Sequence, residues 1–199
     1  MNASIYGHLR LHFQKDPTAA FLPFLQKGFY IEISTGNLLE MVCRTCGLDA
    51  LQVHQRIQTV FLNGKPVDDM ATAYVQDNDC LALSAAMPGL AGATLRRGSV
   101  YAAMRHQVTH DALVHSNIGK EGLIELKLFN LVARDIGPMF LIQGIRINAE
   151  KLINFLRKVP DHFWAGCRVV EINGTPCQPD ELTRIDWEKQ QILLELKVR

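Results

Sequence analysis

The sequence of 199 residues has no long hydrophobic run and no strong bias toward either sign of charge. The most apolar stretch, residues 136–145, is too short to span a bilayer as a helix, and Arg146 closes it. A net charge of +1 gives no basic excess, so we expect neither a nucleic-acid partner nor a membrane partner. The N-terminus lacks the basic and then apolar pattern of a signal peptide, and we expect a cytoplasmic protein.

Cysteine is also scarce. Five cysteines, an odd number, in a chain without a secretory signal favour reduced thiols over a disulfide framework. A redox Cys-x-x-Cys pair normally begins a helix, where the helix dipole lowers a thiol pKa, but Cys43 and Cys46 end a predicted helix. A zinc site usually needs a second such pair, which is absent. We therefore interpret Cys43 and Cys46 as core residues and expect no metal and no cofactor.

Alternation of apolar and polar residues predicts two strands near the N-terminus. In residues 8–13, Leu9, Leu11 and Phe13 would face the core, and the intervening polar residues would face outward. Residues 29–34 alternate in the same way. Residues 16–28 between these strands contain two prolines and predict a loop.

A helix and a hairpin are predicted to follow. Asn37 is a helix N-cap with Glu40 in the capping-box position, and Gly47 is a C-cap glycine. The expected apolar stripe consists of Leu38, Leu39, Val42, Cys43 and Cys46. A strand then runs into Asn63-Gly64, a strong hairpin signal, and residues 80–86 are almost wholly apolar, as in a central strand buried on both faces.

The order strand, strand, helix, strand, turn, strand predicts an α+β fold. We expect residues 1–92 to form a mixed sheet with one helix, which is the ubiquitin-like β-grasp arrangement. Residues 93–122 would form a partly helical connector, and residues 123–199 a second small α+β unit.

Two stretches, VFLNGKPVDD at residues 60–69 and VQDNDCLALSAAMPGLAG at residues 75–92, carry a resemblance. Over about residues 8–92 the chain resembles the β-grasp family of the molybdopterin-synthase small subunit and the thiamine sulfur carrier. Members have an Asn-Gly turn, an Asp-Gly-Asp turn before the last strand and a glycine-rich tail. The corresponding residues here are 63–64, 77–79 and 88–92.

The resemblance implies sulfur-carrier chemistry at this tail. In the family the terminal glycine carboxylate is adenylated and converted to a thiocarboxylate, so the partner would be an adenylating or sulfur-transfer enzyme. This chain departs from the family, because it has GLAGAT where a diglycine terminus should be and continues to residue 199. A carrier would require cleavage after Gly92 or Gly98, and the candidate tail residues are Pro88, Gly89, Gly92 and Gly98. The alternative is a loop punctuated by glycine and proline.

The connector holds the other candidates. Arg96, Arg97, Arg105 and His106 could bind an anion or an acidic partner, or could be a solvated surface. His106 and His110 would share a helix face, but the sequence HQVTH lacks the glutamate of a zinc-protease motif, so we expect no metal there.

The second unit is predicted from residue 123 onward. Residues 123–129 read as a strand, Asn148 caps a helix that stops before Pro160, and Asn173-Gly174 forms a turn. The last residues form a hairpin in which Ile192, Leu194, Leu196 and Val198 share one face. The stretch VVEINGTPCQPD resembles VFLNGKPVDD, either because the halves are internal repeats or because Asn-Gly-x-Pro is good turn chemistry used twice.

No catalytic constellation is apparent, and three functions stay open. The first is a non-catalytic protein-interaction or scaffold protein built on a carrier-like β-grasp domain, with another protein as its partner. The second is the precursor of a sulfur carrier or ubiquitin-like modifier. The third is an enzyme or ligand-binding protein with a site at the junction of the units, using residues 96–115. An exposed edge strand in either unit would also allow a homodimer.

Overall fold

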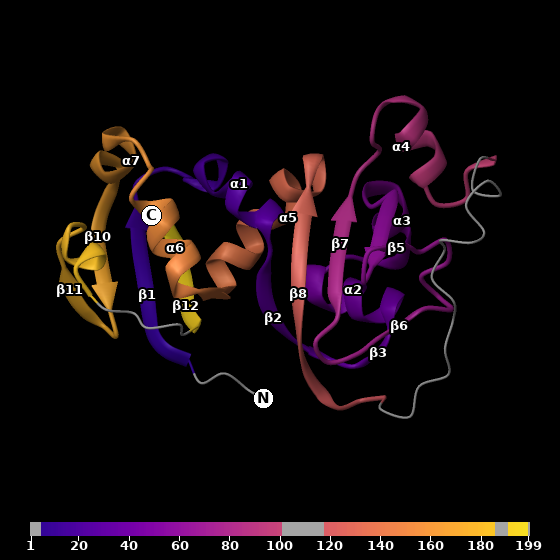
Figure 1. The fold of residues 1–199 in the computed structure, drawn as a ribbon, viewed down its shortest axis with the longest axis horizontal. Helices are drawn as coiled ribbons and strands as arrows, with labels where there is room; N and C mark the ends of the chain where they lie inside the picture. The colour runs from indigo at the N-terminus through magenta and orange to yellow at the C-terminus, as the bar shows by residue number, and fades with distance from the viewer. Residues whose placement is uncertain (1–4, 101–117, 186–190, 199) are drawn as a thin grey trace. The chain divides into compact units, whose positions relative to one another are not determined.

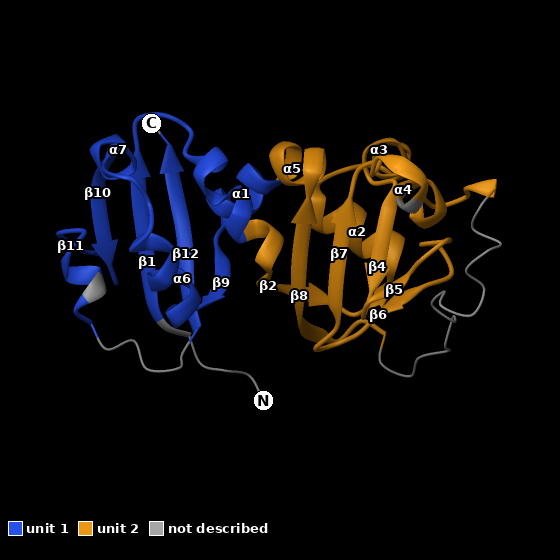
Figure 2. Ribbon diagram, turned by 45° about the horizontal axis from the view of Figure 1, so that its top comes forward, with its two compact units in different colours: residues 1–24, 137–199 blue, residues 25–136 orange. Residues whose placement is uncertain are grey.

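The computed structural model describes residues 5–100, 118–185 and 191–198 (Figure 1). The chain forms two compact units (Figure 2). Unit 1 contains residues 1–24 and 137–199, and unit 2 contains residues 25–136. Each unit has a mixed sheet and helices, so the expected α+β class is confirmed.

The sheet of unit 2 has two parallel strands at its centre. Its strands are, in spatial order, β2 (Phe29–Ser34), β8 (Glu121–Phe129), β7 (Cys80–Ser84), β4 (Thr59–Leu62) and β5 (Lys65–Pro66). β8 runs parallel to β7 and antiparallel to β2, and β4 runs antiparallel to β7. The short strands β3 (Gly36–Asn37) and β6 (Tyr74–Val75) pair separately. The central position of β7 agrees with its expected apolar character.

Local sequence explains the helices of unit 2, α2 (Leu38–Cys46) and α3 (Ala50–Arg56). Oδ1 of Asn37 accepts a 3.2 Å hydrogen bond from the backbone N–H of Glu40, which caps the start of α2. Gly47 ends α2 in the left-handed conformation with a φ of 62°. Both predicted caps are confirmed. Leu38, Val42 and Cys46 are buried as expected, together with Met41.

The sheet of unit 1 also has two parallel central strands. Its strands are, in spatial order, β11 (Thr175–Cys177), β10 (Cys167–Ile172), β1 (Ile5–Phe13), β12 (Gln191–Val198) and β9 (Ile145–Asn148). β1 runs parallel to β12 and antiparallel to β10, and β9 runs antiparallel to β12. The helices α6 (Ala149–Leu156) and α7 (Asp161–Gly166) lie between β9 and β10 in the chain.

An aromatic core fills one side of the unit 1 sheet. Phe13 of β1 meets Phe163 of α7 edge-on, with ring centroids 5.1 Å apart. Phe21, in the helix α1 (Thr18–Lys27), contacts Phe155 of α6 at 5.2 Å. Leu9 and Leu11 are also fully buried, so the predicted apolar face of this strand is the core face. The alternate side chains of β1 therefore lie on the opposite face of the sheet.

The two units differ from the expected division at residues 92 and 123. The first strand, β1, pairs only with strands from the C-terminal part of the chain, β10 and β12. Conversely β8, which was expected to open the second unit, pairs with β2 and β7. Alternation in a strand identifies its buried face but does not identify its partner, so the sequence did not predict this exchange.

Two segments that were predicted as loops are helices. Residues 18–27 form α1 despite Pro23, because the helix buries Phe21, Phe24 and Leu25. Residues 89–95 form α4 (Gly89–Leu95), directly after Pro88. A third helix, α5 (Asn130–Gln143), also contains a proline, Pro138. Burial of apolar side chains therefore outweighs the cost of an internal proline in α1 and α5.

The element order of the first half recurs in the second. α1 and α5 both contain a proline and are followed by a glycine at positive φ, 104° for Gly28 and 99° for Gly144. A strand and an asparagine-capped helix come next in both halves. Both Asn-Gly turns have an asparagine φ of 52° and join antiparallel strands in the same register. The two halves therefore share the order of their helices and strands as well as the Asn-Gly turn, and this favours an internal repeat.

Two further properties concern the chain as described. No helix in the described segments is long and apolar enough to cross a membrane. All five cysteines are free thiols.

Candidate functional site

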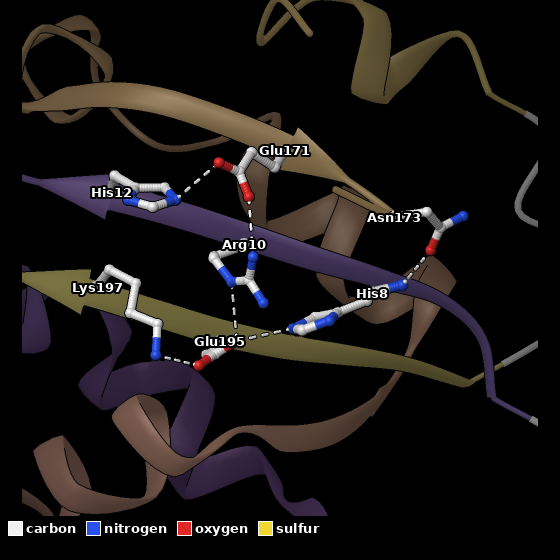
Figure 3. A network of polar contacts seen from close by, with 7 residues as sticks. All are labelled: His8, Arg10, His12, Glu171, Asn173, Glu195 and Lys197. Atoms are coloured by element: carbon white, nitrogen blue, oxygen red, sulfur yellow. Dashed lines mark hydrogen bonds and ion pairs between the residues drawn. The ribbon is translucent and has the colours of Figure 1, made fainter. Parts of the chain in front are cut away.

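A connected network of polar side chains lies on the face of the unit 1 sheet opposite the aromatic core (Figure 3). We call it the polar network; its members are His8, Arg10, His12, Glu171, Glu195 and Lys197. The exposed fractions of these side chains range from 14% for Glu195 to 41% for Lys197. The network is therefore partly shielded by its own members but still accessible to another molecule.

Glu195 on β12 is the centre of the network. Its Oε2 accepts a 2.9 Å hydrogen bond from Nε of Arg10 and lies 2.9 Å from Nε2 of His8. Its Oε1 forms an ion pair with Nζ of Lys197. Burial alone would raise the pKa of this carboxyl, but the hydrogen bonds and charges of Lys197 and Arg10 lower it to about 2. Glu195 is therefore ionised at neutral pH.

Glu171 on β10 supplies the second carboxylate. Its Oε2 accepts a 3.0 Å hydrogen bond from Nη1 of Arg10, and its Oε1 lies 3.2 Å from Nε2 of His12. Nε2 of His12 is buried and has no aligned hydrogen-bond partner among the described residues. The contact between His12 and Glu171 is therefore electrostatic and depends on protonation of the imidazole ring.

Strand register brings these groups together. β1 lies between β10 and β12, and Arg10 is directly opposite Glu171 on one side and Glu195 on the other. Across the antiparallel strands β1 and β10, an oppositely charged pair such as Arg10–Glu171 contributes about 0.2–1 kcal/mol. A slip of one residue would move Arg10 to the apolar face, so the network and the core select the same register.

The Asn173-Gly174 turn holds the N-terminal end of the polar network, at His8, in place. The backbone N–H of His8 donates a 2.8 Å hydrogen bond to Oδ1 of Asn173, and the backbone N–H of Asn173 donates to the carbonyl of His8. Asn173 is thus both a turn residue and a link between β10 and β1 (Figure 3).

The candidate carrier-tail residues lie in and around α4. Pro88 is the residue before the helix, Gly89 begins it with a φ of 80°, and Gly92 is in its middle. A Cβ at Gly92 would lie only 2.0 Å from the carbonyl oxygen of Met87. Gly92 is thus required for packing in this helix, where it is an internal residue.

Gly98, Arg96 and Arg97 line a cavity of about 340 Å³ in unit 2, together with His54, Gln58 and Asp68. Arg97 holds the end of α4 in place. Its backbone N–H donates a 2.9 Å hydrogen bond to the carbonyl of Gln58, and its Nη2 donates to the carbonyl of Ile57. Burial lowers the pKa of the Arg97 guanidinium, although the charge of Asp69 opposes this effect. The structure therefore gives Arg97 a structural role beside the cavity.

The remaining candidates of the connector, Arg105 and His106, lie outside the described residues, as do His110 and most of the predicted connector helix.

The two cysteines of the Cys-x-x-Cys pair are at the C-terminal end of α2. Burial, and to a lesser extent Cys43, raises the pKa of Cys46 to about 12. Burial and the charge of Asp49 raise the pKa of Cys43 as well. A raised pKa disfavours the thiolate, which is the reactive form. In the described segments, no three histidine, cysteine or acidic residues are grouped so that they could hold a metal ion.

Sequence reasoning placed His8, Arg10 and His12 on an outer strand face but did not single out Glu171 or Glu195 as site residues. A signal was present for Glu195 and Lys197, because they are the polar members of an alternating strand, whereas alternation around Glu171 breaks at Val169-Val170. The missing information was that β1 lies between β10 and β12, which alternation alone does not contain.

Comparisons were made with protein-family models, with curated proteins and with solved structures. None of the three finds a match for this chain.

Proposed function

We propose that the protein is a non-catalytic interaction protein that binds another protein through one face of the unit 1 sheet. This face, which we call the open face, carries the polar network and lies opposite the aromatic core. The observation that carries this proposal is the polar network. Its charges are held in fixed positions by ion pairs, and its side chains stay partly exposed on a face opposite the core. The network contains no serine or cysteine nucleophile, and both carboxylates are occupied by cations, so the arrangement suits recognition better than catalysis.

We further propose that unit 2 is related to the β-grasp fold. The central place of β7, its antiparallel pairing with β4 and the capped helix α2 between β2 and β4 support this relationship. A difference in connection is that the strand between β2 and β7 is β8, from later in the chain. Unit 1 has the same pattern of strand directions, with β12 and β1 at its centre. A cytoplasmic location stays a prediction.

The two units also share a sequence feature on their central strands. Glu125-Leu126-Lys127 on β8 and Glu195-Leu196-Lys197 on β12 each form a Glu–Lys ion pair. Glu125 and Lys127 flank the buried Leu126, so they occupy the opposite face of their sheet. We infer that a charged open face is a common property of both units.

Site-specific photo-crosslinking tests the proposed interaction. A photoreactive amino acid replaces Lys197, on the open face, in the full chain expressed in its native cells. The matched control carries it at Lys158, an exposed position beyond α6. We expect a discrete crosslinked complex from position 197 that weakens as salt is raised, since exposed charges are screened within about 10 Å at 0.1 M salt. Equal crosslinking from both positions, or none from position 197, would contradict the proposal.

Intact mass spectrometry of the protein from the same cells tests the carrier alternative. We expect the full chain. A fragment ending at Gly92 or Gly98, above all with the mass shift of a thiocarboxylate, would replace our proposal with a carrier precursor.

A further inference from the structure

The pairing of β1 with β10 is interrupted at one point. His12 is opposite Val169, but the next residue, Phe13, is opposite Cys167, so Arg168 is an extra residue in β10. This is a β-bulge, a feature that redirects side chains and is frequent beside binding sites. Beyond the bulge, the backbone N–H of Gln14 donates a 3.3 Å hydrogen bond to the carbonyl of Gly166.

A cavity of about 490 Å³ opens at this bulge, lined by His12, Phe13, Gln14, Arg168 and Val169. We call it the bulge pocket. Its volume lies in the range of about 300–1,000 Å³ that is usual for small-ligand sites. Val169, whose exposed fraction is 37%, gives the pocket an apolar wall, whereas the Phe13 ring is only 3% exposed and packs against Phe163 in the core.

Arg168 is the cationic group of the pocket. With the amide of Gln14 oriented to satisfy both groups, Nε and Nη2 of Arg168 donate to the side-chain oxygen of Gln14. A guanidinium has five N–H donors in a planar fork, so this contact orients the plane and leaves donors for a ligand. Among the described residues, no carboxylate forms an ion pair with Arg168.

A carboxylate near the pocket restricts the charge of a ligand. His12 lines the pocket, and the Glu171 carboxylate lies behind it, 3.2 Å from Nε2. The Arg168 guanidinium attracts an anion, and the nearby Glu171 carboxylate repels it. The two together favour a ligand with a single negative charge over a phosphate with a double charge. The apolar wall in turn suits an organic body attached to that charge.

We propose that the bulge pocket binds an organic monocarboxylate, with Arg168 as the anchor of the carboxylate and Val169 as the wall for its apolar part. Gln14 is a positioning residue that orients the Arg168 fork. The carboxylate could belong to a free organic acid or to the C-terminus of a peptide, because both present the same planar group. This site does not depend on the protein partner proposed for the open face.

Titrations of the full chain followed by NMR test the site at constant ionic strength. The probes are benzoate, its neutral counterpart benzamide, inorganic phosphate and a short peptide ending in a free phenylalanine carboxylate. We expect benzoate or the peptide to shift the backbone amides of Gln14, Arg168 and Val169, with weaker shifts from phosphate and none from benzamide. The tighter of the two carboxylates identifies the source of the ligand.

Two variants separate a specific site from weak general binding. Arg168→Ala should weaken carboxylate binding about 10- to 100-fold, as expected for losing a charge-assisted hydrogen bond. Arg184→Ala, which removes an exposed arginine of the same unit, should leave it unchanged. The proposal is overturned if benzamide binds as well as benzoate, if Arg168→Ala binds like the original chain, or if no shift appears at millimolar benzoate.

Discussion

Arg10 and Glu195 join the first and last strands of the described chain, with Nε of Arg10 donating a 2.9 Å hydrogen bond to Oε2 of Glu195 although the residues are 185 positions apart. Because Arg10 also donates to Glu171, one guanidinium ties together three strands. The parallel pair β1–β12 and the antiparallel pair β1–β10 therefore share a single electrostatic link.

Replacing Glu195 should change how stability depends on pH. The pKa of Glu195 is about 2 in the folded chain, against about 4.3 for a free glutamate, so its contribution is fully present above pH 4.3 and is lost as the pH falls toward 2. Glu195→Gln should lower the free energy of unfolding by about 1 kcal/mol at neutral pH. It should also weaken the fall of this free energy as the pH drops from about 4.3 toward 2. Urea unfolding between pH 2 and pH 7 measures both effects. Asp180→Asn, in an exposed ion pair, is the control and should change little.

Gly92→Ala tests the packing of α4, because two effects have opposite signs. Helix propensity alone predicts that alanine stabilises the helix by about 1 kcal/mol. The 2.0 Å approach of a Cβ to the Met87 carbonyl predicts destabilisation, and we expect this clash to dominate. Amide hydrogen exchange should accelerate at Arg96, whose N–H bonds to the Gly92 carbonyl. Slower exchange would show that the helix has room for the methyl group.

Arg97→Ala should loosen the segment that follows α4. The substitution leaves the Ile57 carbonyl without its guanidinium donor and removes the 3.3 Å contact between Nη1 and Nδ1 of His54. An unsatisfied buried carbonyl costs about 1–3 kcal/mol. Thermal unfolding and limited proteolysis near residue 97 measure the change. Arg96→Ala is the neighbouring control, and an equal effect of both variants would count against a specific role of Arg97.

The thiols of α2 should be unreactive in the folded protein. With a pKa of about 12, almost none of Cys46 is thiolate at pH 8, and burial also restricts access to it. Cys43, half-buried with a raised pKa, should react slowly but faster than Cys46. Peptide-level mass spectrometry after timed alkylation gives both rates. Rapid labelling of Cys46, or a disulfide between the two under mild oxidation, would refute the interpretation as core residues.

Local features of the fold could be predicted because they depend on neighbouring residues. Asn37 and Asn148 cap helices, which their side chains indicate. Asn63 and Asn173 adopt the left-handed conformation of tight turns, which the glycine directly after each of them indicates. The burial of Leu9 and Leu11 followed from alternation in the same way. These features depend on residues within a few positions of one another, so they can be predicted from the sequence.

The strand partners and the bulge pocket could not be predicted, because they depend on contacts far apart in the chain. Arg168 lines a pocket because β10 pairs with β1, a strand far earlier in the chain, where His12 is opposite Val169 and Arg168 is the extra residue of the bulge. The one local sign was the break in alternation at Val169-Val170, where two apolar residues adjoin. α1 forms although Pro23 favours a loop, because burial of Phe21, Phe24 and Leu25 depends on side chains that are distant in the sequence.

The position of β1 has a consequence for how the protein is made. A ribosome makes this strand well before its neighbours β10 and β12, which begin at Cys167 and Gln191. The paired strands of unit 2 are all made once β8 has emerged, whereas residues 5–13 lack both neighbours until β10 and β12 have followed. During that interval β1 lacks its native partner strands, and an unpaired strand with an apolar face is prone to pair with other chains.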